Sequence, residues 1–136
     1  MKSYNFIDLF SGAGGFTEGF LLAGNGKKQV NLICASDIHE NAKLTHDKRY
    51  KEKLNLNYDF IVGDIRNNST QEQILNSAFK NQTNIDVVVG GPPCQGFSLF
   101  GARREDDPCN TLFSNYLFII KNIQPKYFVM ENVPGL

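Results

Sequence analysis

Residues 4–16 read YNFIDLFSGAGGF, and this stretch decides the fold because an apolar strand runs directly into a glycine-rich turn. From Tyr4 to Phe10 the apolar character continues without strict alternation, as is typical of a strand covered on both faces. The glycines at positions 12, 14 and 15 allow a tight turn and the close approach of a ligand to the backbone at a helix N-terminus. The stretch therefore predicts a strand, a turn and a helix, with a candidate ligand site at the turn.

Outward from this turn, apolar strands alternate with helical segments along the whole chain. This order favours right-handed crossovers and predicts an α/β fold with a doubly wound, mostly parallel sheet in a single domain. Pro125 is placed to stop the last helix, and residues 66–70 are expected to enter the third helix with Ser69 or Thr70 as its cap. The expected strands are 4–10, 30–36, 59–63, 86–90 and 127–131, and the expected helices are 15–23, 40–50, 71–80 and 111–123.

The composition fits one soluble globular domain of 136 residues, with 41% hydrophobic and 21% charged residues, and excludes a disordered or collagen-like chain. Fourteen Lys and Arg residues balance 14 Asp and Glu residues. A net charge of zero argues against a self-sufficient DNA-binding module, which normally carries a basic face. The chain shows neither a signal peptide nor an apolar run long enough for a membrane span, so a cytosolic location is expected.

Two acids follow the second and third expected strands, at the same edge of the sheet as the glycine turn. Asp37 lies where a Rossmann-type site places a carboxylate on ribose hydroxyls, and Asp64 is positioned to accept from an adenine amino group. The turn itself departs from the G-x-G-x-x-G pattern, because Thr17 stands at its third glycine. Convergence of three loops predicts an adenosine-containing cofactor. The alternatives are a plain βα turn, a helix cap at Asp37 and a closed loop at Asp64.

The stretch GGPPCQGFS at residues 90–98 follows the fourth expected strand. Two prolines fix the backbone before Cys94, and the flanking glycines let a substrate come close, which indicates a positioned nucleophile. Glu131 ends the neighbouring strand and would face the same crevice. Alternatively, Cys94 is a buried structural cysteine, as Cys34 is expected to be, and Glu131 pairs with a surface cation.

The three cysteines are odd in number and form no CxxC pair, so neither a disulfide framework nor a metal site is expected. The strongly apolar strand at 127–131 is expected to form an uncovered hydrophobic edge of the sheet, which indicates a missing partner.

Three motifs in this order, FSGAGG at residues 10–15, PPCQGFS at 92–98 and ENV at 131–133, resemble the N-terminal motifs of the DNA (cytosine-5)-methyltransferases over nearly the whole chain. The resemblance implies a Rossmann-like methyltransferase fold with S-adenosyl-L-methionine as cofactor. It assigns Phe10 to packing on the adenine, Asp37 to the ribose and Asp64 to the adenine amino group. The other cofactor contacts that it implies are Gly12, Gly14, Gly15, Ile38, Ile65, Pro93 and Leu112.

By the same resemblance, Cys94 adds to C6 of a cytosine flipped out of double-stranded DNA, and Glu131 holds the N3/N4 edge of the base. Thiolate addition makes C5 nucleophilic enough to accept the methyl group, and loss of the C5 proton then expels the cysteine.

Residues 95–110 would form the loop that closes over the DNA, with Gln95, Ser98 and Arg103 as contacts. Arg104 is interpreted as part of a solvated charge cluster. Cys109 stands where many relatives of the family carry an arginine.

The family pattern continues with a Gln-x-Arg-x-Arg element, a target-recognition domain and a C-terminal motif that returns to the cofactor pocket. Residues 1–136 are therefore expected to be the N-terminal part of the catalytic domain, incomplete at its C-terminal end and inactive alone. Such a chain would be a fragment, or one subunit of a split enzyme that joins a complementary chain in a restriction-modification setting, in the bacterial cytoplasm or at the nucleoid. The alternatives are a non-catalytic cofactor-binding or partner-docking subunit with the same fold, and a tRNA cytosine-5 methyltransferase.

Overall fold

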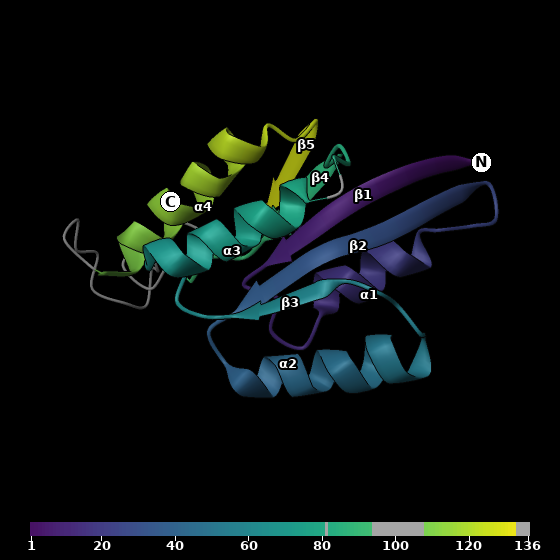
Figure 1. The fold of residues 1–136 in the computed structure, drawn as a ribbon, viewed down its shortest axis with the longest axis horizontal. Helices are drawn as coiled ribbons and strands as arrows, with labels where there is room; N and C mark the ends of the chain where they lie inside the picture. Colours follow the sequence, from purple (N-terminus) through teal and green to yellow (C-terminus); the bar gives the residue numbers. More distant parts are fainter. Residues whose placement is uncertain (81, 94–107, 133–136) are drawn as a thin grey trace.

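The computed structural model describes residues 1–80, 82–93 and 108–132. Within these residues, five parallel strands form one sheet in the order β3-β2-β1-β4-β5 (Figure 1). The predicted doubly wound α/β fold is thereby confirmed. The strands are β1 (Lys2–Leu9), β2 (Lys28–Asp37), β3 (Asp59–Val62), β4 (Val87–Gly90) and β5 (Tyr127–Met130).

Helices cover both faces of the sheet. Helices α1 (Gly15–Leu22) and α2 (Glu40–His46) lie on one side in Figure 1, and α3 (Asn68–Phe79) and α4 (Pro108–Ile123) lie on the other. Successive residues of the central strand supply both cores: Phe6 packs among residues of the α1 side, whereas Ile7 and Leu9 pack with residues of α3 and α4. Burial on both faces explains why the strand sequences are apolar without regular alternation.

The helix boundaries depart from the predicted ones at three places. The expected second helix is divided into α2 and a π-helical segment, η1 (Asp47–Lys53). Helix α3 begins earlier than predicted, and its N-cap residue is Asn67, so the prediction of Ser69 or Thr70 as the cap was wrong. The reason is that Asn67 is extended and its carbonyl accepts the Gln71 N–H at 3.1 Å, while Thr70 is buried inside the helix.

Helix α4 begins at Pro108, where a proline is favoured because the first helical N–H has no partner within the helix. It ends two residues before Pro125, as predicted. No helix among the described residues is long and apolar enough to cross a membrane.

Strand β5 forms an edge of the sheet and pairs with β4. Its apolar side chains are largely uncovered, with exposed fractions of 70% for Tyr127, 52% for Phe128 and 41% for Val129. The predicted hydrophobic edge is therefore confirmed within the described part of the chain.

Candidate functional site

A cavity of about 330 Å³ opens at the carboxyl ends of the strands, beside the point where the strand order reverses. Its walls come from the segments that follow β1, β2, β3 and β4 and from the first turns of α4. Seven residues proposed from the sequence line it: Phe10, Asp37, Ile38, Asp64, Ile65, Pro93 and Leu112. The sequence reasoning missed five other lining residues: Ser36, His39, Gly63, Arg66 and Gly91.

The glycine turn leads the chain from β1 into α1 under unusual backbone angles. Phe10 and Gly12 both have φ of 53°, and Gly14 has φ of 94°. A left-handed conformation is costly for a bulky residue such as Phe10, and residues held in this way concentrate at ligand sites. Gly12, Gly14 and Gly15 are not among the residues that line the cavity, so their predicted contact with the cofactor stays a prediction.

Asp37 connects the second strand to the glycine turn. One of its carboxylate oxygens accepts the Gly12 N–H at 2.8 Å, and the other accepts the His39 N–H at 2.9 Å. Helix α2 has His39 as its N-cap residue and no side-chain cap, so the alternative of a helix cap at Asp37 is not what the structure shows. Because each carboxylate oxygen accepts more than one hydrogen bond, both keep capacity for ligand hydroxyls.

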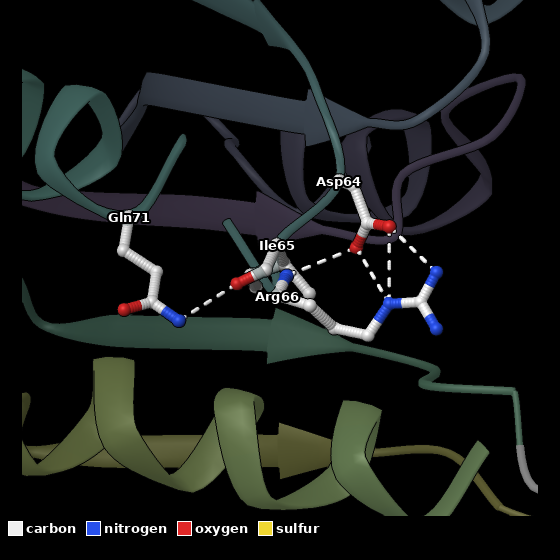
Figure 2. Close-up of polar contacts among 4 residues, drawn as sticks. All are labelled: Asp64, Ile65, Arg66 and Gln71. Atoms are coloured by element: carbon white, nitrogen blue, oxygen red, sulfur yellow. Dashed lines mark hydrogen bonds and ion pairs between the residues drawn. The ribbon is translucent and has the colours of Figure 1, made fainter. Parts of the chain in front are cut away.

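Asp64 is held by the residue two positions further along the chain (Figure 2). Arg66 donates its backbone N–H to Asp64 Oδ1 at 2.9 Å, and its guanidinium donates to both carboxylate oxygens at 2.6–3.0 Å. The Arg66 hydrogen bonds hold the pKa of the Asp64 carboxyl below its usual value. Asp64 thus closes its loop, as the alternative interpretation expected, while it also lines the cavity.

Gln71 of α3 fixes the segment that follows β3 (Figure 2). Its side-chain amide donates to the Ile65 carbonyl at 2.8 Å and to the Asn115 side chain at 3.0 Å, which links α3 to α4 beside the cavity. This hydrogen bond fixes the backbone of Ile65, whose buried side chain forms part of the cavity wall.

Glu131 lies beside the chain that leads to Cys94. Its backbone N–H donates to the Gly90 carbonyl at 3.0 Å, and a Cβ added to Gly91 would lie 3.0 Å from Glu131 Oε2. Glu131 directly follows β5, which ends one residue earlier than predicted and pairs with β4. No ion pair of Glu131 occurs in the part of the chain that the structure describes.

The proposed nucleophile and the proposed DNA contacts, Cys94, Gln95, Ser98 and Arg103, lie outside the described residues. Cys34 is fully buried, and burial raises the pKa of its thiol to about 12, so it is a structural cysteine as expected. Among the described residues, no three His, Cys, Asp or Glu side chains gather in a way that would hold a metal ion.

A buried polar network beneath the glycine turn was missed by the sequence reasoning. Asp8 is buried in β1, and one of its oxygens accepts Ser11 Oγ at 3.1 Å, the Thr17 N–H at 3.1 Å and Thr17 Oγ1 at 2.6 Å. Its burial raises the pKa of the carboxyl to about 6. The one signal that the sequence offers is a charged residue inside an otherwise apolar strand.

The fold and the cavity define a Rossmann-like α/β domain with a candidate ligand site at the carboxyl edge of its sheet. Among solved structures, the chain is similar to YwfH, an NADPH-dependent reductase involved in bacilysin biosynthesis, with a TM-score of 0.60. The alignment covers 96% of this chain and 55% of the reductase at 13% identity, which shows the shared fold alone.

The particular family follows from the sequence comparison. The model of the C-5 cytosine-specific DNA methylase family matches residues 4–136, so the chain belongs to that family, whose members bind DNA and use S-adenosylmethionine. The chain is 39% identical over 97% of its length to the type II methyltransferase M.DdeI of Desulfomicrobium norvegicum, and 41% identical over 96% to M.AquIA of Picosynechococcus. It spans 28% of the first relative and 48% of the second, and corresponds to the N-terminal region of the family.

Proposed function

We propose that this chain is the cofactor-binding and nucleophile-bearing part of a DNA (cytosine-5)-methyltransferase in a restriction-modification system. The observation that carries the proposal is that one cavity is lined by seven of the side chains expected at the cofactor, in a chain of this family. Asp37 and Asp64 were expected there from their positions at the strand ends, and the other five from the resemblance to the family. A complementary chain or further segment supplies the parts that grip the DNA and select the target sequence.

The residues of the cavity fit S-adenosylmethionine. Asp37 accepts the ribose hydroxyls with the capacity left on its two oxygens, and Asp64 accepts the adenine amino group. Apolar side chains on either side, Phe10, Ile38 and Ile65, enclose a flat base. When bound, the cofactor would supply an activated methyl group for C5 of the cytosine.

The chain's own part in the chemistry rests on Cys94 and Glu131. The Cys94 thiolate forms a bond to C6 of the flipped base, while Glu131 hydrogen-bonds the N3/N4 edge and favours protonation at N3. This addition breaks the aromaticity of the ring and makes C5 the nucleophile. After methylation, removal of the C5 proton restores the double bond and breaks the bond between sulfur and C6.

Contacts to DNA are assigned to the segment after Cys94. Gln95, Ser98 and Arg103 would meet the nucleic acid, with the arginine on a phosphate.

The exposed edge of β5 is where a further part of the enzyme would extend the sheet, because an uncovered apolar edge strand is rarely left exposed in a native assembly.

The test is a covalent trap. The chain is combined with a complementary C-terminal half and incubated with S-adenosylmethionine and duplex DNA that carries 5-fluorocytosine at the target position. C5 of this base carries fluorine instead of hydrogen, so no C5 proton can be removed and the cysteine cannot be released. The covalent adduct therefore persists and migrates as a protein–DNA complex in a denaturing gel. We expect an adduct that Cys94→Ser abolishes and that Cys34→Ala, a change to the buried thiol, preserves.

Three outcomes would contradict the proposal. An adduct that survives Cys94→Ser would exclude Cys94 as the nucleophile. Cofactor binding without methyl transfer in every combination of chains would favour the non-catalytic subunit, and preferential labelling of tRNA in competition with DNA would favour the RNA-modifying alternative.

A further inference from the structure

A chain of buried polar side chains beside the glycine turn links Tyr58 to Asp8 through His46 and Ser11. The Tyr58 hydroxyl lies 3.2 Å from His46 Nδ1, and His46 Nε2 lies 2.8 Å from Ser11 Oγ. Ser11 Oγ in turn lies 3.1 Å from Asp8 Oδ2. His46 and Asp8 are fully buried, with exposed fractions of 0%.

The direction of these hydrogen bonds follows from counting protons. An ionised Asp8 only accepts, so the single Ser11 hydroxyl proton points to Asp8. His46 must then donate from Nε2 to Ser11, which leaves Nδ1 to accept the proton of the Tyr58 hydroxyl. The reverse assignment would set the lone pairs of the Ser11 oxygen against the Asp8 carboxylate with no proton between them.

The surroundings of His46 keep the imidazole neutral at pH 7. Burial lowers the pKa of His46 to about 4, which outweighs the attraction of Asp37 and Asp47, while Lys51 adds to the lowering. Aromatic rings pack around the imidazole, at centroid distances of 4.9 Å for Tyr50, 6.1 Å for Tyr58 and 4.8 Å for Phe60. A neutral imidazole with one donor and one acceptor is therefore the form that the network requires.

His46, at the end of α2, and Tyr50, in η1, both lie next to Gly14 of the glycine turn. A Cβ added to Gly14 would lie 3.0 Å from His46 Nε2 and 2.6 Å from the Tyr50 hydroxyl oxygen. Tyr50 donates its hydroxyl proton to the Gly14 carbonyl at 2.9 Å. His46 thus contacts the turn through Ser11, and His46 and Tyr50 together leave no room for a side chain at Gly14.

We propose that His46 is a positioning residue: its neutral tautomer, protonated on Nε2, relays hydrogen bonds from Tyr58 to Ser11 and Asp8 and holds residues 11–15 in the turn conformation that follows Phe10, the residue of this turn that lines the cavity. The relay belongs to the folded chain itself, whereas its effect on S-adenosylmethionine affinity rests on the proposed function.

The first test needs neither a variant nor a cofactor. Long-range ¹H–¹⁵N correlation spectra of the uniformly labelled chain show which imidazole nitrogen carries the proton, and the exposed His39, the only other histidine, serves as an internal reference. We expect His46 to carry one proton, on Nε2, at pH 7 to 7.5, where Asp8 is ionised, and the imidazole to stay uncharged down to about pH 5. A proton on Nδ1, or a charged ring at pH 6, would overturn the proposal.

The second test measures the turn by amide hydrogen exchange. His46→Phe keeps a ring among Tyr50 and Phe60 but removes both hydrogen bonds, and Tyr58→Phe removes only the bond to Nδ1. We expect exchange at the Gly14 and Thr17 amides to speed up by about fivefold or more in His46→Phe and by less in Tyr58→Phe. The Lys80 amide, at the C-cap of α3, should exchange at an unchanged rate in both variants. In the control variant Tyr127→Phe, at the exposed edge strand, exchange at the Gly14 and Thr17 amides should be unchanged. Equal acceleration of Lys80 would mean a general loss of stability and would count against the relay.

Calorimetric titration with S-adenosylmethionine then separates this inference from the proposed function. If the parent chain binds the cofactor and His46→Phe binds it about fivefold or more weakly, both stand. If the parent chain binds none while the tautomer and exchange results hold, the relay stands and the proposed function fails. If the parent chain and His46→Phe bind equally and exchange is unchanged, the relay is wrong.

Discussion

Asp8 caps helix α1 from outside that helix. The helix has Gly14 at its N-cap position, which offers no side chain, and its third residue is Thr17. The Asp8 carboxylate takes the place of a capping side chain by accepting the Thr17 N–H, and its charge lies at the positive end of the helix. An acid in the central strand thereby positions the helix that follows the glycine turn.

Asp8 and His46 make opposite contributions to the pH dependence of stability. The Asp8 pKa rises from 3.8 to about 6 on folding, so its contribution is present below pH 3.8 and is lost as the pH rises through 6. The His46 pKa falls from 6.5 to about 4, so its contribution is present above pH 6.5 and is lost as the pH falls toward 4. Between about pH 4 and 6 the two slopes oppose each other.

Single substitutions should separate the two opposing contributions to the pH dependence of the free energy of unfolding. In Asp8→Asn, only the His46 contribution remains, and the free energy of unfolding should rise between pH 4 and 6 by an amount on the order of 2 kcal/mol relative to the parent chain. In His46→Phe it should fall by a similar amount. Urea denaturation followed by circular dichroism at half-unit pH steps measures both. Parallel curves for the two variants would contradict the assignment.

Asp37 is the carboxylate on which the predicted ribose contact depends. Asp37→Asn keeps one carbonyl oxygen for the neighbouring backbone N–H groups but removes the charge and one acceptor. We expect S-adenosylmethionine to bind about tenfold more weakly, because hydrogen bonds to a charged acceptor are the stronger ones. Titration calorimetry measures this loss, with Glu72→Gln on the exposed face of α3 as the control. Equal weakening by both variants would point to net charge instead of ribose contact.

Among the elements, the glycine turn tolerates change at one position and not at another. Gly14→Ala would place a Cβ 2.6 Å from the Tyr50 hydroxyl oxygen at a φ of 94°, whereas a Cβ at Gly15 meets nothing within 4 Å. We expect Gly14→Ala to lower the free energy of unfolding by about 2 kcal/mol or more, and Gly15→Ala to change it by less than about 1 kcal/mol. Chemical denaturation of the two variants side by side tests this. A loss of less than about 1 kcal/mol in Gly14→Ala would contradict this expectation, and would mean that Tyr50 and η1 shift to make room for the added methyl group.

The order of strands and helices was predictable from the sequence because burial on both faces of a parallel sheet leaves a continuous apolar pattern. Part of the cavity lining was predictable as well, since Asp37 and Asp64 come at the ends of strands that meet at one edge. Five further lining residues were expected only from the resemblance to the family, and five were missed. The relay was not predictable from the sequence. Ser11 links Asp8 and His46 only because α2 packs against the glycine turn, and the spacing of these residues in the sequence gives no sign of it. The π-helical segment was missed for a related reason: packing of Tyr50 under Gly14 accompanies a departure from ordinary helical geometry that propensities do not encode.

On the scale of the whole molecule, the exposed edge of β5 should govern how the isolated chain behaves in solution. Tyr127, Phe128 and Val129 present apolar surface on the strand that forms the edge of the sheet among the described residues. We expect the isolated chain to self-associate in a concentration-dependent way, and Phe128→Lys to shift that association to concentrations about tenfold higher. Analytical ultracentrifugation over a dilution series measures both. A parent chain that stays monomeric throughout would contradict the expectation.

The described walls of the cavity all come from residues 10–112. A break in the gene at any point after that segment leaves these walls on one polypeptide. Recombination could then exchange the portion that chooses the DNA sequence without disturbing the portion that would carry the methyl donor. If the chain has the proposed function, the confinement of the described cavity walls to one segment has an evolutionary consequence, because sequence specificity can diversify while the cofactor-binding part stays unaltered.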